Sequence, residues 1–370
     1  MKPKFNPSVA QIQKVSYVKE AKETFLLDCG DGCSPYGCSK KVAQALRQAN
    51  IQDVAVYPHG FELKDAIIRR WKKYVELSRA TLYLHNSGMD AIACVNTIFA
   101  RPGATVVGIC PQFTDYVLSA QCHGLIYRPV FLQEDENFRI VPQRIMDAIN
   151  AEVSLIYLDN SNNPTGQSIP LDALRTILDR AREVDACVIA DEAYGDYLAP
   201  EDSAITLVRN YDSLIVMRSF SKGVGLAGMR AAYIAASPEI IAQIVKVSNP
   251  YCINGIGRRL AVAALEDTDF VEENRRNIAA AKQELRCCTG GMLTMAETLD
   301  SCSICLLTHK DKTYNLAEFL ASYGVKVVSG SNFEGLGANS VRLRLPPREQ
   351  EKTLRCIVRD IDQGGVNKTS

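Results

Sequence analysis

The segment Met217-Arg-Ser-Phe-Ser-Lys-Gly-Val-Gly-Leu-Ala-Gly-Met-Arg230 decides the expected fold of this 370-residue chain. The apolar residues that lead into it are typical of a short buried strand, which delivers Lys222 to a glycine-rich turn. Ser219, Ser221 and Arg230 surround the lysine with hydroxyl groups and a cation, and glycine lets a backbone approach a ligand closely. The segment therefore predicts a site for a phosphate beside an amine. A serine- and glycine-rich surface turn is the alternative that it leaves open.

Strands alternate with helices on both sides of this segment. Apolar runs predict strands at 81–85, 106–109, 125–132, 153–158, 187–190, 213–217 and 231–236. Helical periodicity predicts helices between them, for example over 91–100, 142–149 and 170–186. This alternation predicts an α/β fold, in which a mostly parallel sheet of the seven-stranded type is covered by helices on both faces. Ligands bind such sheets beyond the carboxyl ends of the strands.

The pattern changes beyond residue 270. A long charged helix over 269–287 could bridge two domains, and a strand, a helix, two strands and a helix follow it between 304 and 361. We therefore expect a large domain at 41–270 and a smaller α+β domain at 271–370. Residues 1–40 form an irregular arm, which we expect to join the small domain.

The composition favours small-molecule chemistry. Lys plus Arg and Asp plus Glu number 42 each, so there is no overall field to attract nucleic acid or an anionic membrane. No apolar run has the length of a membrane span, and the first residues lack the apolar segment of a signal peptide. We expect a cytoplasmic protein with neither nucleic acid nor membrane as a partner.

The 13 cysteines are scattered and odd in number, which argues for reduced thiols rather than a disulfide framework. Cys29, Cys33 and Cys38 share one loop without the spacing of a metal cluster. Cys302 and Cys305 form a single C-x-x-C without a second pair. We therefore expect no metal site, and the role of the loop from Cys29 to Cys38 stays open.

Two further motifs follow predicted strands. In Asp159-Asn-Ser-Asn-Asn-Pro-Thr-Gly166, Asn163 can donate and accept hydrogen bonds, although this is also ordinary turn chemistry. In Ile189-Ala-Asp-Glu-Ala-Tyr194, the Asp191 carboxylate would be costly to bury unpaired, and a pyridinium nitrogen could stabilise it. A helix cap or ion pair for Asp191, and a core aromatic for Tyr194, are the alternatives.

The order of these three motifs, each at the end of a strand, resembles the fold-type I aminotransferases that use pyridoxal phosphate. The resemblance covers essentially the whole chain. It is closest to the branch that contains histidinol-phosphate aminotransferases and threonine-phosphate decarboxylases. The marks of that branch are Val56-Tyr-Pro58, Ala264-Leu-Glu-Asp267 followed by Phe270-Val-Glu-Glu-Asn-Arg-Arg276, and Asn332-Phe-Glu-Gly-Leu336 ahead of Val341-Arg-Leu343.

The resemblance implies roles around the cofactor ring. Lys222 would hold the cofactor's aldehyde as a Schiff base and then move a proton to and from the substrate's Cα. Asp191 would keep the pyridine nitrogen protonated, while Tyr194 and Asn163 would bond the ring oxygen. Phe113 matches the aromatic residue that stacks on the ring.

The resemblance also implies how phosphate and substrate are held. The residues that match the phosphate site, partly at a helix start, are Ser87, Gly88, Met89, Ser219, Ser221 and Arg230. Tyr57 matches a residue that reaches the cofactor of the neighbouring subunit, which implies a homodimer with shared active sites. Arg342 matches the arginine that grips the substrate carboxylate, and we expect Asn163 and Tyr36 on the substrate side.

The chain departs from the family where a second phosphate would bind. Members that act on phosphorylated substrates commonly carry arginine just after the strand at 324–327, where this chain has Val328-Ser-Gly-Ser331. The N-terminal loop Asp31-Gly-Cys-Ser-Pro-Tyr-Gly37 also differs from the family pattern. Arg344 could supply a replacement cation, although a solvated or ion-paired arginine is the simpler interpretation. We therefore expect a substrate without a phosphate.

The expected activity is transfer of an amino group between an amino acid and a 2-oxo acid. A decarboxylase is the alternative, and a racemase or a cyclase could use the same scaffold, because these reactions also begin at Cα. A different class, a ligand-binding module of a transcription regulator, is not favoured, because the chain shows neither a helix-turn-helix extension nor a basic stripe.

Overall fold

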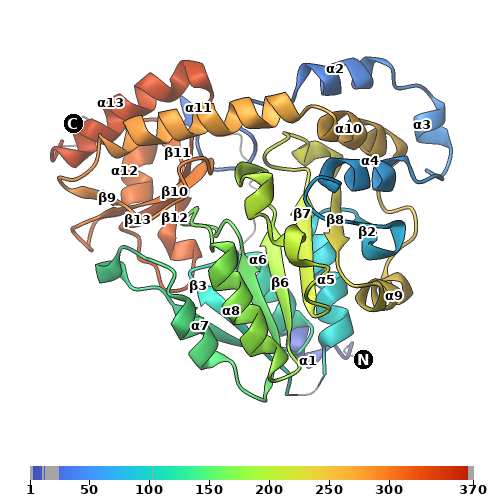
Figure 1. Cartoon of the computed structure of the whole chain (residues 1–370). Coiled ribbons are helices and arrows are strands. Elements are labelled where there is room, and N and C mark those ends of the chain that lie inside the picture. Colours follow the sequence, from blue (N-terminus) through green and yellow to red (C-terminus); the bar gives the residue numbers. More distant parts are fainter. Residues whose placement is uncertain (1–2, 11, 13–24, 102, 366–370) are drawn as a thin grey trace.

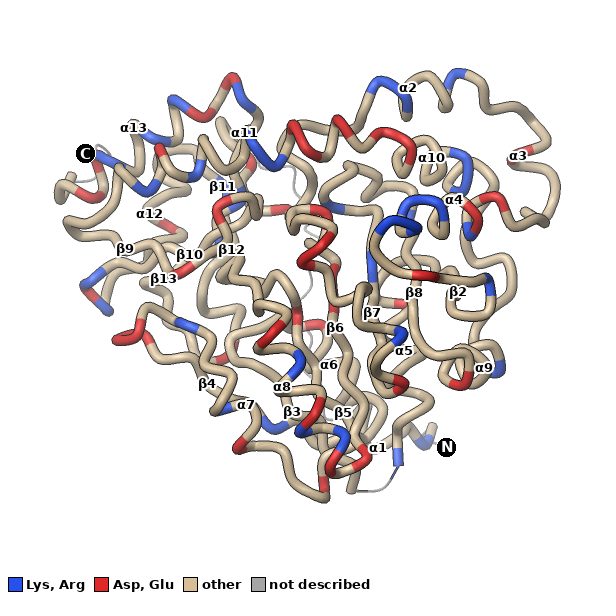
Figure 2. Tube along the Cα trace, in the orientation of Figure 1, with Lys and Arg blue, Asp and Glu red and all other residues tan. Residues whose placement is uncertain are grey.

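The structure is a computed structural model that describes residues 3–10, 12, 25–101 and 103–365. A large sheet lies between layers of helices, and a smaller sheet lies beside it, with a long helix running across both (Figure 1). Acidic and basic residues are interspersed over both parts (Figure 2), in keeping with their equal numbers.

The large sheet has seven strands in the order β2-β8-β7-β6-β5-β3-β4. They are β2 (Leu82–His85), β3 (Thr105–Cys110), β4 (Ile126–Phe131), β5 (Val153–Asp159), β6 (Cys187–Glu192), β7 (Leu214–Ser219) and β8 (Ala232–Ala235). β8 is antiparallel to both neighbours, and the other six are parallel to one another. The predicted mostly parallel sheet is confirmed, and each predicted strand lies within two residues of the observed one.

Helices cover both faces of this sheet, because alternate strand residues point to opposite sides and both sides are apolar. One face carries α5 (Gly88–Phe99), α6 (Thr114–Cys122) and α9 (Pro238–Val247). The other carries α4 (Glu62–Trp71), α7 (Pro142–Ala148), α8 (Leu171–Arg182) and α10 (Gly255–Leu265). The short helices are α1 (Pro7–Ala10), α2 (Lys40–Arg47) and α3 (Gln52–Ala55). Ser39 caps α2 as predicted, because its side chain accepts from the Val42 N–H.

The register of the parallel strands brings polar residues together. Asp159 of β5 lies opposite Asp191 of β6, which lies opposite Met217 of β7. Ser219 is two residues beyond Met217 and therefore points to the same face. Side chains from three separate motifs thus meet at the carboxyl ends of adjacent strands, on the face covered by α5 and α6.

The smaller sheet is antiparallel and has the order β12-β13-β10-β9. Its strands are β9 (Leu293–Met295), β10 (Ile304–His309), β12 (Val328–Ser329) and β13 (Ser340–Arg344). Its helices are α11 (Thr268–Arg286), α12 (Leu316–Ser322) and α13 (Glu351–Asp362). Sequence periodicity did not indicate β9, which is three residues long. The single strand expected near 325–328 is divided into β11 (Val325–Lys326) and β12, which belong to different sheets, and the remaining elements follow the predicted order.

The N-terminal arm and α11 join the two parts of the chain. β1 (Leu27–Asp28) of the arm pairs in parallel with β11 (Val325–Lys326) beside the smaller sheet. α11 contributes Val271 to the core of the large sheet and Ile278 to that of the small sheet. The domain boundaries at residues 40 and 270 stay a prediction, because a shared helix and a shared arm cross them.

All 13 cysteines are free thiols. Among the described residues, no group of three or more His, Cys, Asp or Glu side chains could hold a metal ion. No helix in the described part of the chain has both the length and the apolar composition of a membrane span.

Lys282 of α11 is a fully buried cation at the junction of the two parts. Its ammonium group donates to Thr298 Oγ1 at 2.9 Å and to the carbonyls of Leu299 and Ile304 at 2.8 Å each. The Leu299 N–H in turn donates to the carbonyl of Gly166 in the large part. The three donors of one ammonium group thus organise a loop that contacts the turn after β5.

We expect Lys282→Ala to lower the free energy of unfolding by at least about 2 kcal/mol, because it leaves buried acceptors without their donor. Urea denaturation measures this loss. Lys352→Ala, at an exposed position of α13, is the matched control and should change little. Equal unfolding midpoints for the two variants would show that the buried ammonium does not stabilise the junction.

Candidate active site

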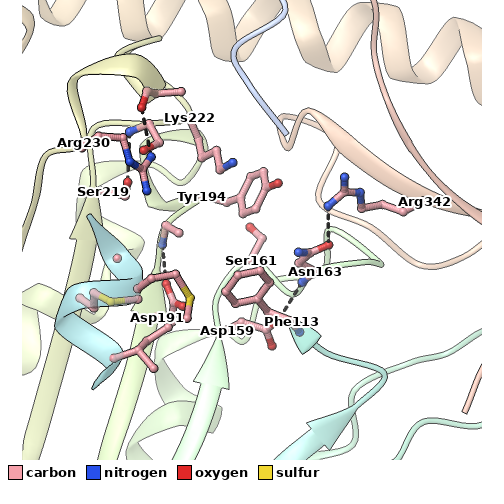
Figure 3. A pocket seen from close by; sticks show the side chains of 17 residues that line it. Phe113, Asp159, Ser161, Asn163, Asp191, Tyr194, Ser219, Lys222, Arg230 and Arg342 are labelled. Carbon is pink, nitrogen blue, oxygen red and sulfur yellow. Dashed lines mark hydrogen bonds between the residues drawn. The ribbon is translucent and has the colours of Figure 1, made fainter. Parts of the chain in front are cut away.

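A cavity of about 180 Å³ opens at the carboxyl ends of β5, β6 and β7 (Figure 3). It brings together most of the predicted site residues: Gly88, Met89, Phe113, Asn163, Asp191, Tyr194, Ser219, Ser221, Lys222, Arg230 and Arg342. Its other lining residues are Ile92, Asp159, Ser161, Ala193, Met217 and Ala227. Residues from the three strand-end motifs, from the starts of α5 and α6 and from the smaller sheet therefore share one space.

Lys222 lies inside the cavity with its ammonium nitrogen 5.6 Å from the centre of the Tyr194 ring. Burial lowers the pKa of this lysine, and the nearby Arg342 guanidinium lowers it further. The carboxylate of Asp31 acts in the opposite direction. A lowered pKa makes the neutral, nucleophilic amine more available, as attack on an aldehyde requires.

Asp191 is the penultimate residue of β6, and 3% of its surface is exposed. The Ala193 N–H donates to its Oδ1 at 2.9 Å, and the Tyr157 hydroxyl donates to its Oδ2. Burial raises the pKa of Asp191 to about 6. Each oxygen can accept a further bond, so the carboxylate suits an N–H cation such as a pyridinium.

Tyr157 was not singled out from the sequence. It precedes Asp159 by two residues in β5, so the alternation of strand side chains places both on the face that carries Asp191. That parity is the signal that could have identified it. It could not show that the Tyr157 hydroxyl reaches Asp191, because this contact depends on the register between β5 and β6.

Ser219 and Ser221 are buried, and the Ser221 N–H donates to Ser219 Oγ at 3.1 Å. Gly88 and Met89 open α5, where amides have no acceptor within the helix and the helix dipole favours an anion. Arg230 lies at the exposed rim and donates to the Ala227 carbonyl at 3.1 Å. These groups line one end of the cavity and suit a phosphate.

Arg342 reaches the cavity from β13 of the smaller sheet. Its Nη1 donates to Asn163 Oδ1 at 3.2 Å, and its Nη2 donates to the Gly30 carbonyl of the N-terminal arm. Its Nε is buried without a hydrogen-bond partner among the described residues. An unsatisfied guanidinium N–H at this place suits an anionic ligand group such as a carboxylate.

The N-terminal arm passes close to two residues that line the cavity. A Cβ atom at Gly32 would overlap the Tyr194 hydroxyl and lie 3.1 Å from Lys222 Nζ. Only a glycine lets the arm pass so close to these two side chains. Burial raises the pKa of Tyr194 to about 12, so this hydroxyl stays protonated at neutral pH.

Three predicted site residues are not among those that line the cavity. Ser87 is the N-cap of α5, and its side chain accepts from the Asp90 N–H. Tyr36 donates its hydroxyl to Glu351 of α13 at 2.8 Å. Tyr57 is 73% exposed and packs on Tyr251 with ring centres 5.2 Å apart. The roles expected for them stay predictions.

A buried ionic network lies on the opposite face of the sheet from Asp191. Arg218 donates to Glu192 at 2.7 Å and to Asp196 at 2.6 Å, and its guanidinium lies 5.0 Å from the centre of the Trp71 ring. A Cβ atom at Gly223, next to Lys222, would collide with Asp196. The network therefore supports the turns that carry Tyr194 and Lys222, and Trp71 is a core residue.

Comparisons with known proteins agree with this geometry. A model of the aminotransferase class I and II family matches residues 26–361. A histidinol-phosphate aminotransferase from Bacillus velezensis is 31% identical over 253 residues, 68% of this chain and 69% of that protein. Another, from Bacillus subtilis, is 28% identical over 340 residues, 89% of each chain. The structure of histidinol-phosphate aminotransferase from Sinorhizobium meliloti in complex with pyridoxal-5'-phosphate has a TM-score of 0.83 at 20% identity, with 99% of each chain covered.

The chain therefore belongs to the aminotransferase class I and II family, and its relatives place it in the branch of the histidinol-phosphate aminotransferases. It is a transaminase that depends on pyridoxal phosphate, and the predicted family membership and cofactor are confirmed. The cavity fits this cofactor. The Lys222 amine suits its aldehyde, the Asp191 carboxylate suits its pyridinium nitrogen, and the start of α5 suits its phosphate. Arg342 lines the same cavity from the smaller sheet, and its buried Nε has no partner among the described residues.

We expect Gly32→Ala to lower kcat roughly ten- to hundredfold, because the added methyl group displaces the Tyr194 hydroxyl within the site. The melting temperature should change little, since the displaced atom is the end of one side chain. Gly228→Ala is the control, because its Cβ would meet no atom within 4 Å. Equal steady-state kinetics for both variants would contradict close packing of the arm on the site.

Proposed function

We propose that this transaminase moves an amino group between an amino acid without a phosphate and a 2-oxo acid. The proposal rests on which cations, at the end of the cavity where the substrate would bind, are free to bond a ligand. Arg342 alone, among the cations of β11, β12 and β13, both lines the cavity and retains an unsatisfied donor. One guanidinium suits the substrate's carboxylate, and the described residues of β11, β12 and β13 offer no second free cation there for a phosphate dianion.

Arg344, the candidate for a replacement cation, is used elsewhere. It is 7% exposed, its Nη1 donates to the Leu345 carbonyl at 2.8 Å, and its Nη2 donates to the Asp28 carbonyl. It is thus neither solvated nor paired with a carboxylate, contrary to the simpler interpretation of the sequence. Because both terminal nitrogens hold backbone carbonyls, Arg344 serves the join between β13 and the arm.

Lys326 is also paired. Its ammonium lies 3.0 Å from Asp28 Oδ2, and this ion pair links β11 to β1 of the arm. The segment Val328-Ser-Gly-Ser331 that follows carries no charge. The paired lysine and the neutral segment support a substrate side chain that is not strongly anionic.

The geometry supports a division of roles within the site. Pyridoxal phosphate, when bound, supplies an electron-accepting ring that acidifies the substrate's Cα–H. We propose that Lys222 receives and returns the Cα proton, and that Asp191 holds the ring nitrogen in its protonated form. Arg342 would hold the substrate carboxylate, which opposes loss of that group as carbon dioxide. This arrangement favours transamination over decarboxylation.

A second candidate is transamination of a phosphorylated amino alcohol. The observation in its favour is that the relatives are histidinol-phosphate aminotransferases. The amino-group chemistry is the same in both cases, so the two candidates differ only in what the substrate end of the cavity must bind. A decarboxylase, a racemase and a cyclase remain alternatives that product analysis separates.

We also propose a cytoplasmic homodimer. Tyr57 is exposed together with other apolar side chains of the same region, namely Ile51, Val54, Val56 and Phe61. Several large apolar side chains exposed within one short segment are typical of a protein contact. Thirteen free thiols suit a reducing compartment.

Replacing Lys222 by Ala should lower turnover by roughly 10²- to 10⁴-fold, because the proton transfer loses its base. It should also abolish the mass increase that borohydride reduction produces when a cofactor is bound to a lysine. Lys246→Ala, an exposed position on α9, is the control. Retention of the mass increase in Lys222→Ala would refute the assignment.

For the substrate, we expect kcat/KM with the best unphosphorylated amino acid to exceed that with histidinol phosphate and threonine phosphate at least tenfold. The assay pairs each donor with a panel of 2-oxo acids and follows the new amino acid, carbon dioxide and racemised donor. Arg342→Gln should lower kcat/KM roughly ten- to hundredfold for carboxylate-bearing donors, because a charged hydrogen bond is lost. A clear preference for either phosphorylated donor would refute the proposed substrate class, whereas the assignment as a transaminase would still hold.

A further inference from the structure

Asp159 is a buried carboxylate at the cavity to which none of the roles above is assigned. It is the last residue of β5 and 3% exposed, and it lines the cavity in the same row as Asp191. A carboxylate is costly to bury, so its retention there requires donors. Its donors connect two separate walls of the site.

Two backbone amides from different turns donate to one oxygen of Asp159. The Asn163 N–H donates to Oδ2 at 2.8 Å, and the Phe113 N–H donates to the same atom at 3.3 Å. Phe113 follows β3, whereas Asn163 follows β5. One carboxylate oxygen therefore fixes both residues relative to the sheet (Figure 3).

Asn162 reinforces the same junction. Its side-chain amide donates to Asp159 Oδ1 at 2.9 Å and to the Pro111 carbonyl at 3.1 Å. Its own oxygen accepts from the Thr165 N–H at 3.2 Å. The turn after β3 and the turn after β5 are thus joined through a small network with Asp159 at its centre.

The network depends on the ionised form of Asp159, because all three of its donors are N–H groups and a protonated carboxyl would lose acceptor capacity. Burial raises the pKa of Asp159 to about 7, and the neighbouring Asp191 contributes to this rise, while the Asn163 amide and the Asn162 side chain oppose it. The donors are therefore what keeps a useful fraction of the carboxylate ionised near neutral pH.

We propose that Asp159 is a positioning residue of the cofactor site, whose carboxylate holds the turn that carries Phe113 against the turn that carries Asn163. Phe113 and Asn163 line the cavity in which the cofactor ring is expected to bind. Asp159 then acts on cofactor binding through these two residues rather than by touching the substrate. The proposal does not depend on which amino acid the enzyme uses.

A double-mutant cycle tests this proposal with cofactor affinity as the readout. The dissociation constant of pyridoxal phosphate is measured by fluorescence titration of the full-length protein after removal of the cofactor, for the wild type, Asp159→Asn, Phe113→Ala and the double variant. Asp159→Asn should raise the dissociation constant about tenfold or more, because the charged acceptor is lost. Phe113→Ala should raise it by a smaller factor in the Asp159→Asn background than in the wild type, because its ring is no longer held in place.

Asp179→Asn is the matched control, because this carboxylate is on the exposed side of α8. This variant should bind pyridoxal phosphate with the dissociation constant of the wild type. A merely structural role for Asp159 predicts that Phe113→Ala acts by the same factor in both backgrounds. That result, or wild-type affinity in Asp159→Asn, overturns the proposal. If Asp159→Asn does not fold, Asp159→Ser, which is smaller and keeps one acceptor oxygen, carries the same cycle.

Discussion

The parallel register of β5, β6 and β7 is the constraint on which the rest of the structure depends. It sets Asp159, Asp191 and Met217 side by side at the carboxyl ends of three strands, although they are far apart in the chain. Two buried carboxylates in one row would repel each other and lose hydration. Donors close to each one, including the Tyr157 hydroxyl and the amides of the following turns, offset that cost.

The smaller sheet and the N-terminal arm complete the site that the large sheet begins. Arg342 of β13 bonds at once to Asn163 of the large part and to the Gly30 carbonyl of the arm. Gly32 then brings the arm backbone against Tyr194 and Lys222. The arm and β13 share one hydrophobic core, and together they meet the large sheet around one cavity.

Several buried cations are used for architecture rather than for ligands. Lys282 holds the loop after β9 through two carbonyls and a hydroxyl, and Arg344 holds the arm through carbonyls. Arg218 pairs with two carboxylates behind the sheet. A buried cation must be compensated, and these three cations meet that need with groups of the protein itself.

The sequence by itself determined the order of the elements, the mostly parallel sheet and the positions of Lys222, Asp191 and Asn163 at strand ends, because hydrophobic periodicity and turn chemistry are local properties of the chain. It placed most residues that line the cavity. Only the tertiary structure decided that Tyr157 bonds Asp191, that Tyr36 turns to Glu351 and that Arg344 is held by the arm. The reason is physical, because these contacts join segments that are brought together by strand register and by packing of the arm, which no local pattern encodes.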